Sequence, residues 1–285
     1  MMRGAMAHYV KSHGLGNDYI VIDPRRVPFR VTPEAARLIC DRHRGVGSDG
    51  ILIVSEPRGA DFGVRILNPD GSEAEKSGNG IRIFAKYLRE HGYTTADRFT
   101  IDTVGGLVSV ALSVRDRRVR EVTADMGTVR FDPLEAIEVD GQKLPVTFLS
   151  IGNPHCVVVL ADLASVDPHA LGPLIERHAA FPARTNVQFA EVRSRSRIAI
   201  EIWERGAGYT LASGTSSCAA AAACHRNGLV DRDVTVTMPG GELAVTVGEG
   251  YAMRLRGPVE EVMSGDLSVD LLERLAAPPR DSLPS

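Results

Sequence analysis

The sequence is poor in aromatic and sulfur-containing side chains and has no long apolar run. Its 285 residues include one tryptophan and four cysteines. Cys40, Cys156, Cys218 and Cys224 form neither a C-x-x-C pair nor a disulfide framework, which is typical of a reducing compartment. No stretch approaches the roughly 20 apolar residues that span a membrane. The N-terminal residues lack the apolar centre of a signal peptide. We therefore expect a cytoplasmic protein without a membrane partner.

The chain also lacks a strong net charge. Its formal net charge is −3, with 44% hydrophobic and 24% charged residues, which is ordinary for a soluble globular protein. This balance gives no support for a nucleic-acid partner. His8, His13, His43 and His91 do not have the spacing of metal ligands, so no metal site is expected. These absences favour an enzyme or a binder of small molecules.

What the chain does contain is an internal repeat. Residues 64–78 (VRILNPDGSEAEKSG) and 200–214 (IEIWERGAGYTLASG) each run from an alternating apolar stretch through a turn to Ser-Gly. The numbers of Ser77 and Ser213 differ by 136, and so do those of Asn17 and Asn153, each of which follows a glycine. Three landmarks at one offset, counting the glycines that end the following helical stretches, indicate two copies of one unit.

The pattern inside each copy mixes strands and helices. Stretches such as 19–23, 50–54 and 62–67 show the β-branched enrichment or alternation of strands. Residues 32–44 predict a helix, because Thr32 suits the N-cap and Pro33 the first helical position. A second helix is expected over 79–92, ending at a glycine. Its counterpart over 216–228 is rich in alanine, which implies close packing inside a sheet.

Each Ser-Gly pair comes immediately before a predicted central helix. A helix N-terminus offers free N–H groups and a partial positive charge, and two such ends facing each other would suit a carboxylate. We expect the repeat to gather polar, nearly neutral side chains around this cleft, as an amino-acid ligand requires. The candidates are Asn17, Asn68, Asn79, Asn153, His155, Asn186, Glu204, Arg205 and Thr215.

Seven motifs, in order along nearly the whole chain, resemble the diaminopimelate epimerase family. They are HGLGNDY, DRHRGVGSDG, NPDGSEAEKSGNGIR, GNPHCVV, FPARTNVQF, ERGAGYTLASGTSSC and MPGGELAV. The resemblance implies an α+β fold of two pseudo-symmetric domains, each a curled mixed or antiparallel sheet around a central helix. We place these domains at 7–125 and 126–265, with 266–277 completing the first and 278–285 a disordered tail.

The same resemblance implies a reaction. The family interconverts LL- and meso-diaminopimelate for lysine and peptidoglycan synthesis, without pyridoxal phosphate or metal. One thiolate removes the α-proton and a thiol on the opposite face delivers another. A homodimer is also implied. The residues expected to bind the substrate are Asn17, Asn68, Gly78, Asn79, Asn153, Asn186, Glu204, Arg205, Gly214 and Thr215.

The two catalytic cysteines of the family correspond to Ser77 and Ser213 here. A thiol begins near pKa 8.5 and a helix N-terminus lowers it further, whereas a serine hydroxyl starts several units higher. Serine could act if a neighbouring base took its proton, and His155 and Glu204 are the candidates. Three explanations stay open: serines active through that pair, a changed reaction on a related amino acid, or substitutions introduced to trap a ligand.

Two plainer interpretations also stand beside these. Serine is among the best N-cap residues, so Ser77 and Ser213 are expected to cap their helices whether or not they act in chemistry. A protein that kept the cleft and lost the reaction would be a non-catalytic amino-acid binder. Lys76 precedes Ser77, but neighbouring side chains at a helix start point apart, so we expect Lys76 to be solvated rather than paired with the serine.

Overall fold

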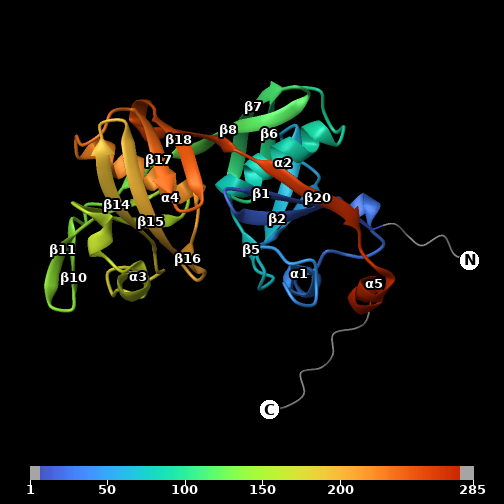
Figure 1. Ribbon diagram of the computed structural model, residues 1–285, viewed down its shortest axis with the longest axis horizontal. Coiled ribbons are helices and arrows are strands. Elements are labelled where there is room, and N and C mark those ends of the chain that lie inside the picture. The colour runs from blue at the N-terminus through green and yellow to red at the C-terminus, as the bar shows by residue number, and fades with distance from the viewer. Residues whose placement is uncertain (1–6, 277–285) are drawn as a thin grey trace, which may run out of the picture.

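The computed structural model describes residues 7–276, which form two lobes side by side (Figure 1). The fold is α+β, as predicted, and each lobe wraps strands around one 13-residue helix. The helices of the described part are α1 (Pro33–Cys40), α2 (Gly78–Glu90), α3 (Pro168–Glu176), α4 (Gly214–Arg226) and α5 (Val269–Ala276). The predicted tail over 278–285 lies outside the described residues. None of these helices is long and apolar enough to cross a bilayer.

The strands follow one order in both halves of the chain. The first half contains β1 (His8–Gly14), β2 (Asn17–Ile22), β3 (Ile51–Ser55), β4 (Phe62–Leu67), β5 (Glu73–Ala74), β6 (Arg98–Thr103), β7 (Gly106–Arg115) and β8 (Arg118–Thr128). The second contains β9 (Arg130–Phe131), β12 (Thr147–Ser150), β13 (Pro154–Leu160), β14 (Asn186–Ser194), β15 (Arg197–Glu204), β16 (Gly208–Thr210), β17 (Asp233–Met238), β18 (Gly241–Val247) and β19 (Ala252–Pro258). A hairpin of β10 (Ala136–Val139) and β11 (Gln142–Pro145) interrupts this order, and β20 (Glu260–Asp266) follows it.

Strand pairing confirms the internal duplication. In the first half β2 runs parallel to β3 and β4 parallel to β6. In the second half β13 runs parallel to β14 and β15 parallel to β17. The other equivalent neighbours are antiparallel, and α2 and α4 begin after the equivalent short strands β5 and β16. The repeat in sequence is therefore a repeat in three dimensions.

The chain crosses between the lobes twice. Strand β8 pairs with β19 in an antiparallel ladder, after which β9 joins β12 in the second lobe. After β19 the chain returns, and β20 pairs with β1 in the first lobe. Residues 260–265 thus lie beside β1, although they fall inside the range expected for the second domain. We propose that the second domain ends near Val259 rather than at residue 265. The other expected domain limits stay predictions.

Local signals explain how α1 begins and what it packs against. Thr32 is the N-cap, its Oγ1 accepts a hydrogen bond from the Ala35 amide at 3.2 Å, and Pro33 opens the helix, as predicted. The apolar face of α1 shares a core cluster with β2, β3 and residues Leu267 and Leu271. The end of the described chain, including α5, is therefore packed on the first lobe.

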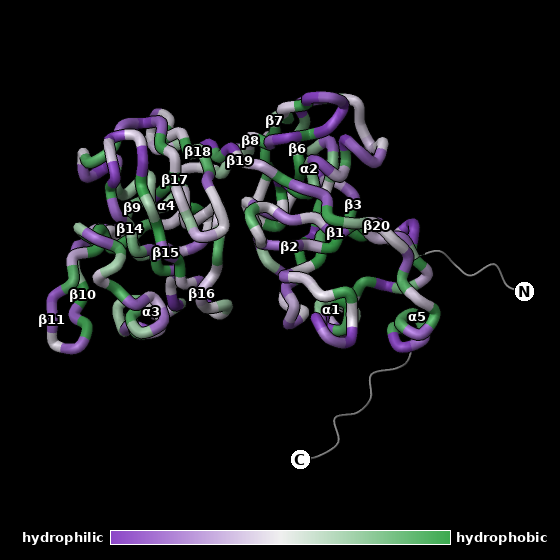
Figure 2. Tube along the Cα trace, viewed as in Figure 1, coloured by the Kyte–Doolittle hydropathy of each residue, from purple (hydrophilic) through white to green (hydrophobic). Residues whose placement is uncertain are grey.

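The central helices are enclosed by their sheets. All residues from Gly214 to Cys224 on α4 are buried, which confirms the close packing expected from its alanines. Small side chains allow the strands of the second lobe to approach the helix axis closely. Helix α2 is buried from Gly78 to Leu88. Hydrophilic residues gather along the outer turns (Figure 2). The first residues of both helices, Gly78 and Gly214, lie against each other where the lobes meet.

Candidate active site

The N-termini of α2 and α4 meet at their first residues. A Cβ atom added to Gly78 would lie 3.1 Å from the Gly214 Cα, and one added to Gly214 would lie 3.1 Å from the Gly78 Cα. Only glycine allows this approach. The free N–H groups and positive ends of two helix dipoles are therefore brought together, which makes a place for an anion.

Ser77 and Ser213 cap these helices in the same way. Both have extended backbone, with φ/ψ of −136°/122° and −145°/125°. Ser77 Oγ accepts a hydrogen bond from the Gly80 amide at 3.0 Å, and Ser213 Oγ accepts one from the Ser216 amide at 3.4 Å. The expectation that both serines are N-caps is confirmed.

Ser77 has a second partner that sequence reasoning missed. The Tyr19 hydroxyl donates to Ser77 Oγ at 3.2 Å, and Tyr19 is almost fully buried. Burial raises the pKa of Tyr19, and the charge of Glu204 adds to that rise, so the phenol stays protonated. A hydroxyl accepts about two hydrogen bonds, and both acceptor positions of Ser77 are taken. Its own O–H is left to donate.

Ser213 lies beside a carboxyl group instead. Burial raises the pKa of Glu204, a hydrogen bond with Ser213 opposes this rise, and the charge of Asp49 adds to it. Glu204 ends β15 in the second lobe, yet its charge acts on Tyr19 and Asp49 of the first. The structure therefore brings Glu204 to the junction, next to Ser213.

His155 is fully buried on β13, at the position related to Tyr19 by the 136-residue repeat. Its Nε2 lies 3.0 Å from Asn153 Oδ1, while its Nδ1 has no partner among the described residues. Burial lowers the pKa of His155 to about 3, so the ring is neutral at physiological pH. A ring with that pKa is a weak base.

Two predicted asparagines are hydrogen-bonded to each other, and one of them, Asn79, also bonds across to the second lobe. Asn79 Nδ2 donates to Asn17 Oδ1 at 3.0 Å and to the Ala212 carbonyl at 3.3 Å, just before Ser213. Asn17 Nδ2 donates in turn to Asp49 Oδ2 at 2.9 Å. The amides of both asparagines are thus held in one orientation beside the helix N-termini.

Hydrogen bonds to Asn186 and Glu176 fix the turn that carries Glu204 and Arg205. Asn186 Oδ1 accepts from the Arg205 amide at 3.0 Å. The nearly buried Glu176 accepts from Trp203 Nε1 at 2.9 Å and from the Gly206 amide at 3.0 Å. Burial would raise the pKa of Glu176, but these hydrogen bonds outweigh it and lower the pKa. Sequence reasoning did not single out Glu176.

The remaining predicted residues are placed less centrally. Asn68 lies in the turn between β4 and β5, where its amide donates to Ser72 Oγ at 3.0 Å. The Arg205 guanidinium is exposed and donates to the Ala183 carbonyl at 3.1 Å. Thr215 Oγ1 lies 3.5 Å from Ser213 Oγ. The ligand contacts of these residues, like those of the other predicted site residues, stay predictions.

Lys76 corrects one expectation. It is half-buried rather than solvated, and its Nζ donates to the Met126 carbonyl on β8 at 2.9 Å. Burial lowers its pKa. The side chain does point away from Ser77, but the opposite direction leads into the neighbouring strand instead of solvent.

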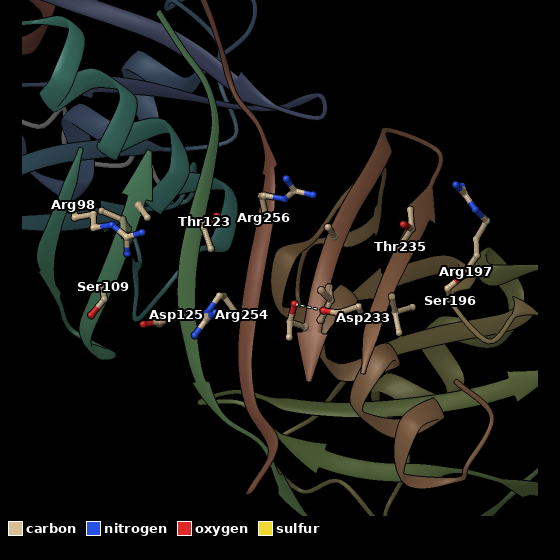
Figure 3. Close-up of a pocket in the computed structure, with 16 residues that line it drawn as sticks. Arg98, Ser109, Thr123, Asp125, Ser196, Arg197, Asp233, Thr235, Arg254 and Arg256 are labelled. Carbon is tan, nitrogen blue, oxygen red and sulfur yellow. Dashed lines mark hydrogen bonds and ion pairs between the residues drawn. The ribbon is translucent and has the colours of Figure 1, made fainter. Parts of the chain in front are cut away.

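A separate groove of about 720 Å³ lies over the strands that join the lobes, on the face opposite the central helices (Figure 3). None of the predicted site residues lines it. Within the groove Arg254 pairs with Asp125, while Arg256 pairs with Glu121 outside its lining. Within residues 7–276 no three His, Cys, Asp or Glu side chains lie close enough together to hold a metal ion.

Solved structures share this fold. A hydroxyproline epimerase from Agrobacterium vitis aligns with a TM-score of 0.73 at 17% identity, covering 95% of this chain and 94% of that one. A phenazine biosynthesis protein of the PhzF family from Bacillus anthracis aligns with a TM-score of 0.71 at 15% identity, covering 93% and 99%.

Sequence comparison is more specific. The chain is 44% identical to diaminopimelate epimerase 2 of Nostoc sp., covering 92% of this chain and 96% of that protein. It is also 44% identical to the diaminopimelate epimerase of Pelotomaculum thermopropionicum, covering 91% and 98%. The family model for diaminopimelate epimerase matches residues 9–131 and 147–263, omitting the β10–β11 hairpin. The chain belongs to the diaminopimelate epimerase family.

Proposed function

We propose that this protein is an isomerase that interconverts LL- and meso-diaminopimelate without pyridoxal phosphate. Membership of the family supports the substrate. The observation that carries the chemistry is the pair of equivalent capping serines on two helices whose first residues touch. In the proposed complex such a pair would place one proton-transferring group on either side of the bound carbon, as inversion of a centre requires.

We place the α-carboxylate of the substrate at the two helix N-termini. The free amides of Gly78, Asn79, Gly214 and Thr215 would donate to its oxygens, with Asn17 beside them. Negative charge develops on this carboxylate when the Cα–H bond breaks and its electron pair moves toward oxygen. Donors already in place stabilise that charge without reorganising.

The surroundings of the two serines suggest how protons move. On one face the α-proton passes to Ser213 Oγ as Ser213 releases its own proton to the Glu204 carboxylate. On the other face Ser77 donates its proton to Cα and recovers one from Tyr19. Protons return through solvent after each turnover. A hydroxyl is a poorer acid–base group than a thiol, so this route is slower than a thiol pair.

The serines favour one second candidate, a non-catalytic binder of amino acids. The site keeps the anion-binding ends of both helices and the hydrogen-bonded pair of asparagines, which are all that binding needs. Loss of the two thiols that the family resemblance implies would remove the reaction and keep the ligand.

The decisive experiment follows the α-carbon in deuterated water. Purified protein is incubated with LL-diaminopimelate and the Cα–H signal is followed by NMR. Loss of that signal together with appearance of the meso form establishes an epimerase. Saturable binding without exchange identifies the binding protein, and absence of both contradicts the proposed substrate.

We further propose a cytoplasmic homodimer that supplies lysine and peptidoglycan synthesis. Val262 and Met263 support association, because both are about half exposed on β20, which pairs only with β1 among the described strands. Light scattering coupled to size exclusion checks the assembly. A particle of one chain at micromolar concentration would contradict it.

A further inference from the structure

Arg82 is a fully buried cation without a carboxylate partner. Its side chain is 0% exposed on the second turn of α2. Within residues 7–276 no acidic oxygen forms an ion pair with its guanidinium, and its Nε has no hydrogen-bond partner. Its two remaining nitrogens donate to Gly78 O at 3.1 Å and Asn79 Oδ1 at 2.8 Å.

The protein is built closely around this guanidinium. A Cβ on Gly14 would come within 2.9 Å of Arg82 NH2, and one on Gly257 would lie 3.5 Å from its Nε. Gly14 on β1 thus leaves room for the head group, and Gly257 on β19 lies at ordinary contact distance from it. Burial lowers the pKa of Arg82 to about 10, so it is still charged near neutral pH. A buried charge without a partner is unfavourable, because it has lost its hydration and gained no opposite charge in return.

The position of this charge points to what balances it. Arg82 bonds to Gly78 O and to the Asn79 side chain, at the helix end that touches α4. The Arg82 charge therefore lies close to the junction at which two positive helix ends meet, which favours binding of an anion there.

We infer that Arg82 is a positioning residue whose counter-ion is the carboxylate of the bound amino acid at the junction of α2 and α4. This rests on the proposed amino-acid site. Arg82 acts through its field and through Asn79, whose oxygen it holds so that the Asn79 amide faces Asn17 and Ala212. If Arg82 served only the fold, replacing it would lower the stability of the ligand-free protein and leave ligand affinity unchanged.

The test compares Arg82→Met, which removes the charge, with Arg82→Lys, which keeps it. The matched control is Arg195→Met, an exposed arginine paired with Asp231 on the outer turn of the second lobe. Calorimetry measures the Kd of meso-diaminopimelate, and thermal unfolding is recorded with and without this ligand. Neither measurement needs turnover, so slow chemistry at the serines does not affect them.

We expect Arg82→Met to weaken binding at least tenfold and to lose the rise in unfolding midpoint that the ligand causes. Its ligand-free midpoint should stay within a few degrees of the wild type. Arg82→Lys should bind within about fivefold of wild type, because it keeps the charge whose field acts on the carboxylate. A large fall in the ligand-free midpoint with unchanged Kd overturns the inference.

Two further outcomes separate this inference from the proposed function. If Arg82→Met does not fold, Arg82→Lys decides: a loss of affinity beyond tenfold contradicts a role of charge. If the wild type ignores diaminopimelate but binds another α-amino acid in an Arg82-dependent way, the substrate is wrong and the inference stands. If it binds no amino acid, both are overturned.

Discussion

The N-terminal ends of α2 and α4 share one plan and differ in what faces each capping serine. Both helices have 13 residues, begin with glycine and follow a short antiparallel strand. Ser77 accepts a hydrogen bond from the neutral phenol of Tyr19, whereas Ser213 lies beside the carboxyl group of Glu204. The backbone of the duplicated unit has stayed symmetric while its side chains have become different. In the proposed reaction Ser77 donates a proton to Cα, and Ser213 accepts the proton that leaves Cα.

The largest effect is expected from placing a thiol at the N-terminus of both helices, which removes the difference between the two capping serines. We expect Ser77→Cys with Ser213→Cys to raise the rate of epimerisation about a thousandfold, because the thiol pKa lies several units nearer neutral. Proton NMR in deuterated water measures it. Each single variant should accelerate exchange mainly in the diastereomer whose Cα–H faces the new thiol.

A serine far from the junction controls for this experiment. Ser196→Cys on the exposed turn before β15 adds a thiol away from the helix N-termini and should leave exchange unchanged. No gain from the double variant would mean that the site has lost more than its thiols.

Removing the acceptor beside Ser213 should have the next largest effect. Glu204→Gln is expected to slow exchange about a hundredfold in the wild-type background, since general-base help is worth roughly that much. The raised pKa of Glu204 means that wild-type activity falls as the pH drops through it, and the variant should lose this limb. The pH profile of kcat checks both points, with Glu201→Gln on the same strand as control.

In the double-cysteine background Glu204→Gln should slow exchange less than in the wild-type background, because a thiol needs less help in releasing its proton. That result would support Glu204 as the proton acceptor beside Ser213. An equal loss in both backgrounds would show that Glu204 binds substrate and takes no part in proton transfer.

The repeat-related pair Tyr19 and His155 differs in how stability depends on pH. In the folded protein burial holds the pKa of His155 at about 3, against about 6.5 when unfolded. Between these values only the unfolded chain binds the proton, so stability falls as the pH drops below 6.5. At pH 5 this amounts to about 2 kcal/mol. Urea unfolding at pH 7 and pH 5 measures it.

His155→Gln isolates this contribution, because glutamine does not titrate. The variant should lose about 2 kcal/mol less than wild type between the two pH values. Equal losses would place the acid sensitivity elsewhere.

The smallest expected effect concerns the donor to Ser77. Tyr19→Phe removes one hydrogen bond and no volume, which is worth about 1 kcal/mol, or about fivefold in rate. Coupling to Ser77→Ala in a double-mutant cycle tests whether Tyr19 acts through that hydroxyl. Additive losses would refute it. Tyr209→Phe, which loses a bond to Glu201, is the matched control.

Local patterns predicted much of this molecule. The repeat, the start of α1 at Thr32 and Pro33, and the enclosed alanine helix followed from spacing, capping preference and side-chain size. Each of these depends on residues near one another in sequence or on a constant offset. The same offset would have found Tyr19, since it lies 136 positions before His155.

Other features depend on contacts that no local pattern encodes. The return of β20 to β1 is decided by which lobe has an open strand edge. Lys76 bonds to Met126 because a strand 50 residues later passes beside it. Glu176 supports the Glu204 turn from another helix through Trp203 and Gly206. The roles of all the predicted site residues as ligand contacts stay predictions, and the side chains of Asn68 and Arg205 bond locally in this structure.

The double crossing of the chain has a consequence for synthesis on the ribosome. Strand β1 lies between β2 and β20, yet β20 covers residues 260–266, almost the last of the described chain. Likewise, β8 lacks its partner strand until β19 has been synthesised. While the chain emerges from its N-terminus, the first lobe exposes two strand edges with unpaired N–H and C=O groups, which invite pairing with other chains. The lobe made first is therefore the lobe finished last, and nascent chains of this protein need protection until their final strands arrive.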